Sequence, residues 1–487
     1  MNSLQRVFSK ITLKPSAGSE RHQRPEANED DFVEFRGGDV ENPRNWSLAR
    51  KRYITAITLL LSANGSIASS ITAGNSQSIT EEFGISTVAA QLPISLFLLG
   101  FCAGPLLFGP LSEFYGRRWI LYTTFFLYFC CTYLTAWPPN LGGLLVGRFL
   151  AGSFASGPFV IGPAVLVDLW DKGERGNAMG ILICISWVGP ALGTVISGFF
   201  ELKKNWRWST YACLWLGSFT IMLMFTIPET HSPTILTQKA RLARHQGHNM
   251  QSAGEASRPK LLQLYKTALT RPWVLLFDTI SFLCCLYSCL ISALQYMLFN
   301  IYPIVFHDLR GWNVGVSQLP VLGQAIGAVF GLLIIFYHSR CRKRKADMGR
   351  DMLPEDHMIL AMIGGVGFPI SMLWLSWSAQ YNSVHWIVPT AGGTVLATCL
   401  MLIHVSCFSY ITDTYADYAA SVIAVNIVVR CVSSAGAPLF TTQMFDSIGI
   451  GGGGSLIAGT AALLAITPFL FYRYGHTIRS KSKYALA

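Results

Sequence analysis

The sequence predicts an all-α membrane protein, with twelve transmembrane helices arranged as two six-helix bundles. Of its 487 residues, 51% are hydrophobic and only 13% are charged, and the mean hydropathy is +0.40. The apolar residues gather in twelve runs, each long enough to cross a hydrocarbon layer of about 30 Å as a helix. A long polar break, at about residues 229–273, separates the first six runs from the last six. Two comparable sets of helices are therefore expected.

The chain order follows directly from these runs. Residues 1–52 are polar and rich in charge, and they lack the apolar core of a signal peptide, so they are predicted to form a disordered tail. The spans are predicted at 53–72, 88–108, 119–137, 141–167, 176–200, 208–228, 274–305, 314–337, 358–378, 384–408, 418–445 and 455–472. The predicted organisation is thus a first bundle over 53–228, a linker over 229–273, a second bundle over 274–472 and a tail over 473–487.

Positive charge is unevenly divided between the two sides of these spans. Of the 37 lysines and arginines, two lie within spans, and the only ones in loops opposite the N-terminal tail are Lys203, Lys204, Arg207 and Arg310. Loops that keep lysine and arginine generally face the cytoplasm, so both termini are predicted to be cytoplasmic. The net charge of +11 then belongs to loops beside anionic lipid, and no nucleic-acid partner is expected.

Cysteine usage and motif content argue against catalytic chemistry. Eleven of the twelve cysteines fall in predicted spans and Cys341 lies in a basic loop, so neither disulfides nor a metal site is expected. No zinc-protease, Cys-x-x-Cys, nucleophile-elbow or ATP-binding motif occurs, so the sequence predicts no enzyme and no cofactor. The glycine-rich stretch 449–455 lacks the strand and lysine of a phosphate-binding loop and is expected to be a flexible linker between spans.

A polar stretch of ten residues, Gly109–Arg118, separates the second span from the third. It places one acid, Glu113, and two bases, Arg117 and Arg118, at the membrane surface. The stretch resembles the loop signature of the major facilitator superfamily, Gly-x-Leu-x-Asp-x-x-Gly-Arg-Arg/Lys, with Glu113 in place of the usual aspartate. An ordinary basic loop on the cytoplasmic side is the alternative interpretation.

Asp168 ends the fourth span on the same side as this loop. The resemblance implies a charge relay between the two loops, so Glu113, Arg117, Arg118 and Asp168 are expected to form a latch that favours one access state. Such a latch requires partial burial, because exposed ion pairs contribute little. The alternative is a solvated acid at a helix end.

Two residues are predicted to take part in proton coupling. Arg148, about 10 Å inside the outer end of the fourth span, stands in Arg148-x-x-Ala151-Gly152, which resembles the superfamily's Arg-x-x-Gln-Gly element of proton antiporters. Asp278 lies early in the predicted seventh span, where a shielded carboxyl could bind and release a proton. The alternatives are a snorkelling or structurally paired arginine and a plain interfacial acid.

The fifth span carries Gly189, Pro190 and Gly193 in an order that resembles the Gly-Pro-x-x-Gly-Gly element of antiporters, with Thr194 replacing the last glycine. Small residues at this spacing let helices pack closely, which is also the purely structural interpretation. The match favours export over uptake.

Polar and aromatic residues within the spans are candidates for a substrate cavity. Arg430 is the only charged residue in the eleventh span. The full set of candidates is Asn64, Trp187, Gln295, Tyr296, Asn300, Asn426 and Arg430.

The segment Glu41–Ser47 resembles the lead-in of fungal drug:proton antiporters within the superfamily. This resemblance implies a plasma-membrane exporter of drugs, antifungals, toxins or secondary metabolites, driven by protons and working by alternating access. Its expected partners are a small-molecule substrate, protons and the lipid bilayer, and it is expected to be monomeric. A polyamine or nutrient transporter on the same fold, and a non-transporting membrane sensor, are the alternatives.

Overall fold

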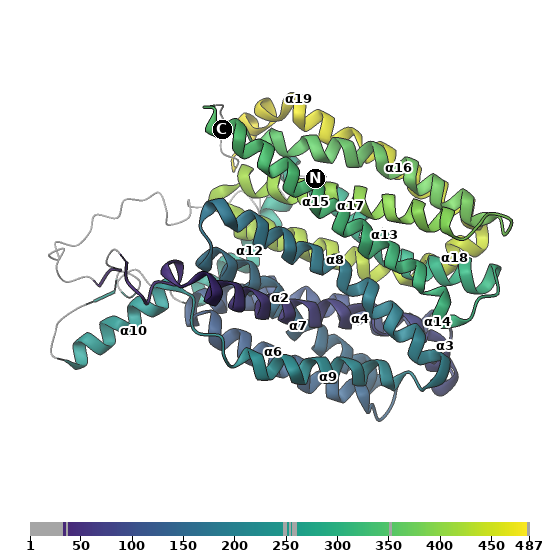
Figure 1. Cartoon of the computed structure of the whole chain (residues 1–487), viewed down its shortest axis with the longest axis horizontal. Coiled ribbons are helices and arrows are strands. Elements are labelled where there is room, and N and C mark those ends of the chain that lie inside the picture. Colours follow the sequence, from purple (N-terminus) through teal and green to yellow (C-terminus); the bar gives the residue numbers. More distant parts are fainter. Residues whose placement is uncertain are drawn as a thin grey trace, which may run out of the picture.

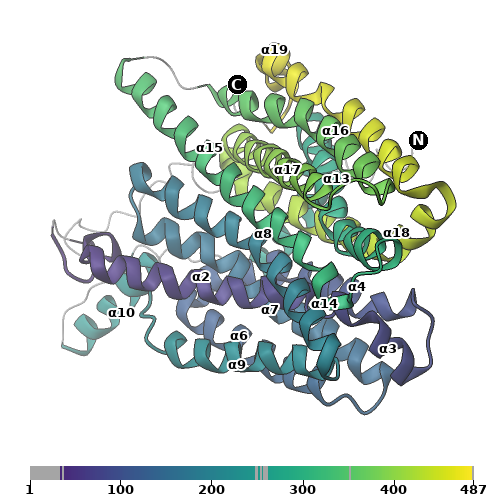
Figure 2. The ribbon, with the colours of Figure 1, turned by 45° about the vertical axis from the view of Figure 1, so that its right-hand side comes forward.

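A computed structural model describes residues 33–35, 38–246, 251–252, 255, 261–349 and 353–484. The described chain is almost entirely helical, and its helices run roughly side by side in two groups (Figure 1). Helices from the first part of the sequence, purple to blue, form one group, and green to yellow helices form the other (Figure 2). This arrangement confirms the predicted class, an all-α membrane protein with two bundles.

The first bundle extends to the end of α9. Its elements are the short turn η2 (Pro43–Asn45), α2 (Leu48–Ser70), η3 (Ala73–Asn75), α3 (Ser76–Phe83), η4 (Ala89–Gln91), α4 (Leu92–Phe101), the π-helix η5 (Gly104–Phe108), α5 (Gly109–Tyr115), α6 (Arg117–Ala136), α7 (Leu141–Leu169), α8 (Lys172–Lys203) and α9 (Arg207–Met224). Two helices, α10 (Ser232–His245) and α12 (Leu261–Leu276), lie in the segment between the bundles.

The second bundle begins at α13. Its elements are α13 (Thr279–Pro303), the π-helix η6 (Ile304–Leu309), α14 (Val314–Ser317), η7 (Leu319–Val321), α15 (Leu322–Asp347), η8 (Pro354–His357), α16 (Met358–Gln380), α17 (Ile387–Thr414), η9 (Ala416–Tyr418), α18 (Ala419–Leu464) and α19 (Ile466–Lys481).

Ten helical segments of the described chain combine the length and the apolar composition needed to cross a membrane. One of them, 416–481, is 66 residues long and turns at Gly449, so it contains two spans. Helix α9, with 18 residues, is about 27 Å long and supplies one more. The described residues therefore account for the twelve predicted spans.

The predicted flexible linker at 449–455 is wrong. Only Gly449 leaves the helical conformation, with φ 73° and ψ 168°, and the glycines after it are helical. The backbone N–H of Gly451 donates to Oε1 of Gln380 at 2.7 Å, and a Cβ at Gly454 would overlap Ser376. These glycines are small so that the last span can lie directly on α16, and they do not serve as a hinge.

The predicted seventh span, 274–305, begins too early. The chain turns at Phe277 and Asp278, whose N–H groups bond to the carbonyls of Val274 and Leu275, and Asp278 itself is extended. Helix α12 ends before this turn and α13 begins after it, so the span runs over Thr279–Leu309.

The first helix begins earlier than predicted. Ser47 caps α2 by accepting the N–H of Arg50 at 3.4 Å, so residues 48–52, expected in the disordered tail, form its first turn. Lys239 of α10 pairs with Asp39 at 2.6 Å just before this helix. Residues 1–32, 36 and 37 of the predicted tail lie outside the described residues.

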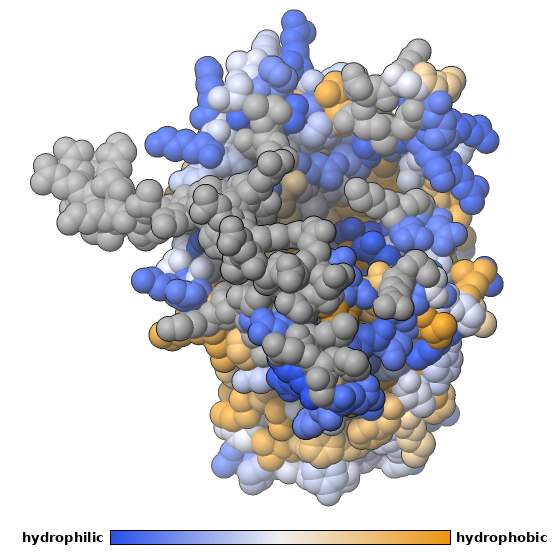
Figure 3. Space-filling model, turned by 90° about the vertical axis from the view of Figure 1, so that its left-hand side faces the viewer, coloured by the Kyte–Doolittle hydropathy of each residue, from blue (hydrophilic) through white to orange (hydrophobic). Residues whose placement is uncertain are grey.

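One end of the helices carries most of the positive charge and is called the basic end here. It includes the start of α6 with Arg117 and Arg118, the end of α15 with Arg340 and Arg342, and the neighbouring helix α10. Figure 3 views this end, where hydrophilic residues gather on the face and hydrophobic ones lie along its lower flank. The other end of the helices is called the opposite end.

Candidate functional site

The N-terminus of α6 is closed by a carboxylate from a distant part of the chain. Glu229, which follows the last helix of the first bundle, accepts the backbone N–H of Arg117 at 2.9 Å and that of Arg118 at 3.2 Å. A carboxylate at this position satisfies N–H groups that have no partner within the helix and complements the helix dipole. Glu229 thereby ties the loop between α5 and α6 to the end of α9.

Gly116 makes this arrangement possible. It precedes α6 with φ +97°, a conformation that favours glycine, and a Cβ there would lie 2.5 Å from Oε2 of Glu229. Glu229 was not among the residues predicted from the sequence. Its only signal is an acid placed directly after Pro228, where the sixth span ends.

The side chain of Arg117 extends toward the end of α7. Its Nε lies 3.4 Å from Oδ2 of Asp168, and its Nη1 donates to Oγ of Ser112 at 2.8 Å. The side chains of Arg117 and Asp168 are only 12% and 17% exposed. Partial burial is the condition under which such a pair contributes more than a surface ion pair does. The structure thus brings together two of the four predicted latch residues.

The other two latch candidates lie apart from this ion pair. Glu113 on α5 is exposed and forms no hydrogen bond or ion pair with any other residue that the structure describes. Arg118 donates from Nε to the hydroxyl of Tyr122 at 3.2 Å, and Tyr122 donates to the carbonyl of Ile227 at 2.8 Å. Arg118 therefore fastens α6 to the segment after α9.

His231 completes the corner around Glu229. Its backbone N–H donates to Glu229 at 2.9 Å, and its Nδ1 lies 2.8 Å from Oγ1 of Thr234 in the first turn of α10. Burial, and then the positive charge of Arg117, lower the pKa of His231 to about 4. A neutral imidazole at physiological pH avoids placing a second cation beside Arg117.

Arg148 lies inside the first bundle and is only 3% exposed. Its Nε donates to the carbonyl of Pro93 on α4 at 3.0 Å, and its Nη2 donates to the carbonyl of Ala68 on α2 at 2.9 Å. Its guanidinium carbon lies 4.5 Å from the centre of the Phe97 ring. Among the described residues, no carboxylate lies within 4.0 Å of it. One guanidinium therefore joins α7 to α2 and α4 while its charge stays unpaired.

Tyr296 connects the second bundle to the surroundings of Arg148. Its hydroxyl donates to Oγ of Ser69 on α2 at 3.0 Å, and the carbonyl of Ser69 lies 3.4 Å from Nη2 of Arg148. Tyr296 also lies within electrostatic range of both Arg148 and Arg430. Its neighbour Gln295 is buried as well. This contact is a direct path from the predicted coupling residue to the other bundle.

Arg430 has a histidine as its hydrogen-bond partner. Its Nη1 lies 3.1 Å from Nε2 of His404 on α17. The His404 ring meets the edge of Trp187 on α8, with the ring centres 6.0 Å apart and an interplanar angle of 79°. The predicted candidates Trp187 and Arg430 are therefore joined through His404, a residue that the sequence did not place in the cavity.

The predicted asparagines bond within single bundles. Asn426 on α18 donates to Oγ of Ser288 on α13 at 3.3 Å, and Asn300 donates to a carbonyl oxygen of α18 at 3.4 Å. Asn64 on α2 donates to Oγ1 of Thr220 on α9 at 2.9 Å. Each amide joins two neighbouring helices of its own bundle.

The three small or rigid residues of α8 lie against α2. A Cβ at Gly189 would overlap Ser66, and one at Gly193 would overlap the backbone of α2. Oγ of Ser70 donates to the carbonyl of Pro190 at 2.6 Å. Here the absence of side chains lets two helices touch through their backbones.

Asp278 lies at the basic end, directly before the first residue of α13. Its carboxylate accepts hydrogen bonds from the hydroxyl of Tyr415, after α17, and from Oγ of Ser482, after α19, the latter at 2.9 Å. It therefore joins three segments of the second bundle at a helix end.

Helix α8 contacts the second bundle near both of its ends. Near the basic end, a Cβ at Gly180 would lie 2.9 Å from Cε1 of Phe336 on α15. Near the opposite end, a Cβ at Gly198 would lie 2.6 Å from Cγ of Gln318. Together with the bond between Tyr296 and Ser69, these contacts hold the bundles together at three levels.

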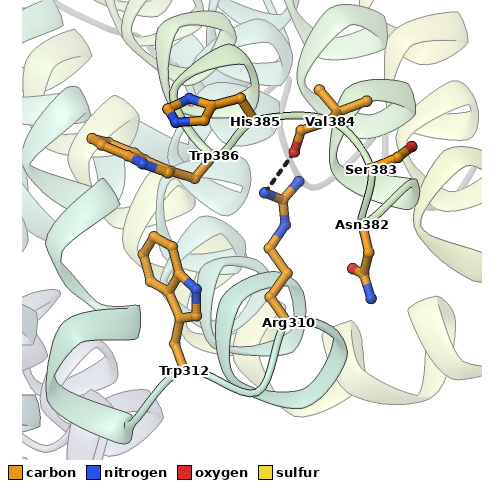
Figure 4. A pocket seen from close by; sticks show the side chains of 7 residues that line it. All are labelled: Arg310, Trp312, Asn382, Ser383, Val384, His385 and Trp386. Atoms are coloured by element: carbon orange, nitrogen blue, oxygen red, sulfur yellow. Dashed lines mark hydrogen bonds between the residues drawn. The ribbon is translucent and has the colours of Figure 1, made fainter.

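A surface pocket of about 410 Å³ opens at the opposite end, between the loop after η6 and the loop before α17 (Figure 4). Arg310 crosses it and donates to the carbonyl of Val384 at 2.9 Å. Trp312 and Trp386 form one wall, with ring centres 6.1 Å apart. The pocket belongs to loops of the second bundle, whereas Arg148 and Arg430 lie within helices.

The fold resembles solved structures of a sugar transporter. The proton:xylose symporter XylE bound to 6-bromo-6-deoxy-D-glucose superposes with a TM-score of 0.63 and 16% identity, over 88% of this chain and 96% of that one. XylE from E. coli in a partially occluded inward-open conformation gives 0.59 and 17%, over 88% and 98%. At this identity the likeness supports the fold alone.

Several fungal proteins are similar over nearly the whole chain. They include the Efflux pump FUBT of Fusarium oxysporum, 36% identical over 93% of this chain and 77% of its own length. The multidrug transporter mdrA of Aspergillus fumigatus is 36% identical over 92% and 74%. The multidrug transporter FLU1 of Candida albicans is 32% identical over 99% and 81%.

The model of the Major Facilitator Superfamily matches residues 56–438, which span the first ten helices of the two bundles and most of the eleventh. This match confirms the family that the loop Gly109–Arg118 indicates, a family of transporters rather than enzymes. This protein therefore belongs to the Major Facilitator Superfamily of multi-pass membrane transporters.

Proposed function

We propose that this protein exports amphipathic organic compounds, such as drugs, antifungals, toxins or secondary metabolites, in exchange for protons. The observation that carries the proposal is the similarity, at 32–36% identity, to fungal proteins named efflux pump or multidrug transporter. The position of Arg148 supports the proton-driven part. Each proton that enters down 100 mV contributes about 2.3 kcal/mol.

Arg148 is the proposed centre of the coupling. Its Nε donates to a carbonyl oxygen of α4 and its Nη2 to one of α2, so its positive charge is held between three helices. A fixed charge beside the bond from Tyr296 to Ser69 can bias how the two bundles meet, because any change of protonation or substrate charge nearby alters the local electrostatic energy. Alternating access then follows from bundles that separate at one end at a time.

Asp278 is a second proposed proton carrier. It is partly exposed at the basic end and bonded to Tyr415 and Ser482, so its protonation would loosen three segments at once. Transport that keeps its native pH dependence in Asp278→Asn would remove Asp278 from the coupling path.

We also propose that the basic end faces the cytoplasm of a plasma-membrane protein that works as a monomer, with both termini on that side. The distribution of lysine and arginine supports this orientation. Cysteine accessibility in whole cells tests the orientation: a cysteine introduced at an exposed position of α10 should react with a charged thiol reagent only after the cells are opened.

Each bundle is proposed to move as a unit about the interface along α8.

The test of the proposed function is transport by the purified chain in sealed proteoliposomes. A proton gradient should drive amphipathic drugs across the membrane in the direction opposite to the proton flow, and collapse of the gradient by a protonophore should stop this transport. Transport of a polyamine with no response to drugs would favour the alternative carrier instead.

A further inference from the structure

We propose that Arg430 and His404 form an anion-binding site for the transported compound, so that preferred substrates carry a carboxylate or a similar organic anion on an aromatic body. This inference rests on the proposed transport function and names the substrate class of its interior site. It is carried by the hydrogen-bond geometry of the two side chains and by the charges around them.

Arg430 lies inside the membrane-spanning part of α18, about 17 Å along the helix axis from Ala419. Its Nη1 is 3.1 Å from Nε2 of His404. A guanidinium has only donors, so Nε2 of His404 must be the acceptor of this bond. His404 is then the neutral tautomer that carries its proton on Nδ1.

The site has an excess of donors. Nδ1 of His404 is buried and has no partner among the described residues. Arg430 forms no other side-chain hydrogen bond with the described part of the chain, and its side chain keeps intermediate exposure. The indole N–H of Trp187, whose ring touches His404, forms no hydrogen bond to a described residue either. The guanidinium of Arg430, Nδ1–H of His404 and the indole N–H of Trp187 are thus three neighbouring donor groups without a negatively charged acceptor.

No acid neutralises Arg430. Within the described residues, no carboxylate lies within 4.0 Å of it. The acid on its own helix α18, Asp446, is 16 residues further along the chain, about 24 Å along the helix axis. An unpaired cation within a membrane protein is costly, and such residues generally line a path for substrate or ions. A bound organic anion would supply the missing charge and accept the free N–H groups.

The neighbouring bundle reinforces the same polarity. Arg148 donates from Nε and Nη2 to backbone carbonyls, which hold its guanidinium in place as a second positive charge. Tyr296, which bonds to Ser69 beside Arg148, lies within electrostatic range of both guanidiniums. An organic anion is attracted by both, whereas a polyamine or another cation is repelled by both.

The aromatic part of the substrate has a natural partner in Trp187. This indole comes from α8 of the first bundle, whereas Arg430 and His404 come from the second. A ligand that stacks on the indole while its anion bonds to Arg430 would touch both bundles at once. The affinity for such a ligand therefore depends on the relative position of the two bundles, as alternating access requires.

The test is binding to the purified full-length chain in detergent at pH about 7.5, without any gradient, where carboxylates are ionised and amines are protonated. Three probes share one ring system: 1-naphthoate, the neutral 1-naphthamide and the cationic 1-naphthylmethylammonium. The native chain should bind naphthoate at least about tenfold more tightly than either of the others. Naphthoate binding no tighter than naphthamide binding, or no binding of any probe at about 1 mM, would overturn the proposal.

Arg430→Gln should weaken naphthoate binding about tenfold and leave naphthamide binding within about twofold. Arg430→Lys should keep part of the preference, because it keeps the charge but loses the planar fork. Arg473→Gln is the matched control, since Arg473 is exposed on α19, and it should change neither affinity. If Arg430→Gln elutes as an aggregate, the selectivity of the native chain alone decides. Gradient-driven transport in proteoliposomes, measured separately, decides the proposed function.

Discussion

The carboxylate of Glu229 accepts the backbone N–H of Arg117 at 2.9 Å, and this bond joins the end of α9 to the start of α6 across 112 residues of chain. The same carboxylate accepts N–H groups from Arg118, Thr230 and His231. Four backbone donors on one acid make Glu229 the centre of the corner that carries the family's loop signature. The position of Arg117, a predicted latch residue, depends on this acid as well as on its own helix.

Glu229→Gln should destabilise the protein by about 1–2 kcal/mol, because the substitution removes a charged acceptor from a helix N-terminus and from a cluster of four donors. The apparent melting temperature of the purified protein in detergent measures this loss. Glu113→Gln is the matched control, since Glu113 is an exposed glutamate on the adjacent helix α5. Equal melting temperatures for both variants would show that the capping contribution is negligible.

Gly116→Ala should destabilise the same corner by about 1–3 kcal/mol, because an alanine at φ +97° is strained and its Cβ would press on Glu229. Gly84→Ala separates the two causes. Gly84 has φ +60°, but a Cβ there would meet nothing within 4 Å. The melting temperature should fall further for Gly116→Ala than for Gly84→Ala; the reverse order would contradict the contact.

The ion pair between Arg117 and Asp168 is proposed to act as a latch in transport. Asp168→Asn and Arg117→Gln should each slow transport by about three- to tenfold, and the double variant should be no slower than the worse single one, because both remove the same contact. Initial transport rates in proteoliposomes measure this non-additivity. Rates that multiply independently would show that the two side chains do not act together.

The low pKa of His231 predicts how stability changes with pH. Its pKa is about 4 in the folded chain and about 6.5 when unfolded, so the folded state prefers neutral His231. This contribution is complete above pH about 6.5 and is lost as the pH falls through about 4. The melting temperature of His231→Gln should therefore fall less steeply between these values than that of the native chain. A native and a variant curve of equal slope would contradict the buried, neutral histidine.

Much of the fold could be predicted from the sequence because the bilayer imposes a simple rule. Apolar runs of sufficient length must be helical, and basic residues collect on one side. This rule predicts the spans, and the Gly109–Arg118 loop identifies the family. The same rule fails where the apolar run continues but the helix does not, as in the predicted seventh span, which extends back past Asp278. There the chain turns because Asp278 is held by side chains from two other segments.

The candidate site was only partly predictable, because its key contacts join residues that are distant in the sequence. Nothing near Arg148 indicates that its partners are carbonyl oxygens on α2 and α4. Glu229 and His404 each bond to a residue more than 20 positions away in the sequence, Arg117 and Arg430 respectively. The glycines after Gly449 resemble a linker by composition, and only the neighbouring helix α16 explains why they must be small.

The central claim is that proton movement and substrate movement are coupled through Arg148. The most direct measurement is proton flux across the membrane of sealed proteoliposomes, followed with a trapped pH-sensitive dye, when a transported drug is added outside without an imposed pH gradient. The native chain should move protons in the direction opposite to the drug, and Arg148→Gln should bind the drug but move neither. Drug movement by the native chain without any proton flux, or full coupling in Arg148→Gln, would contradict the account.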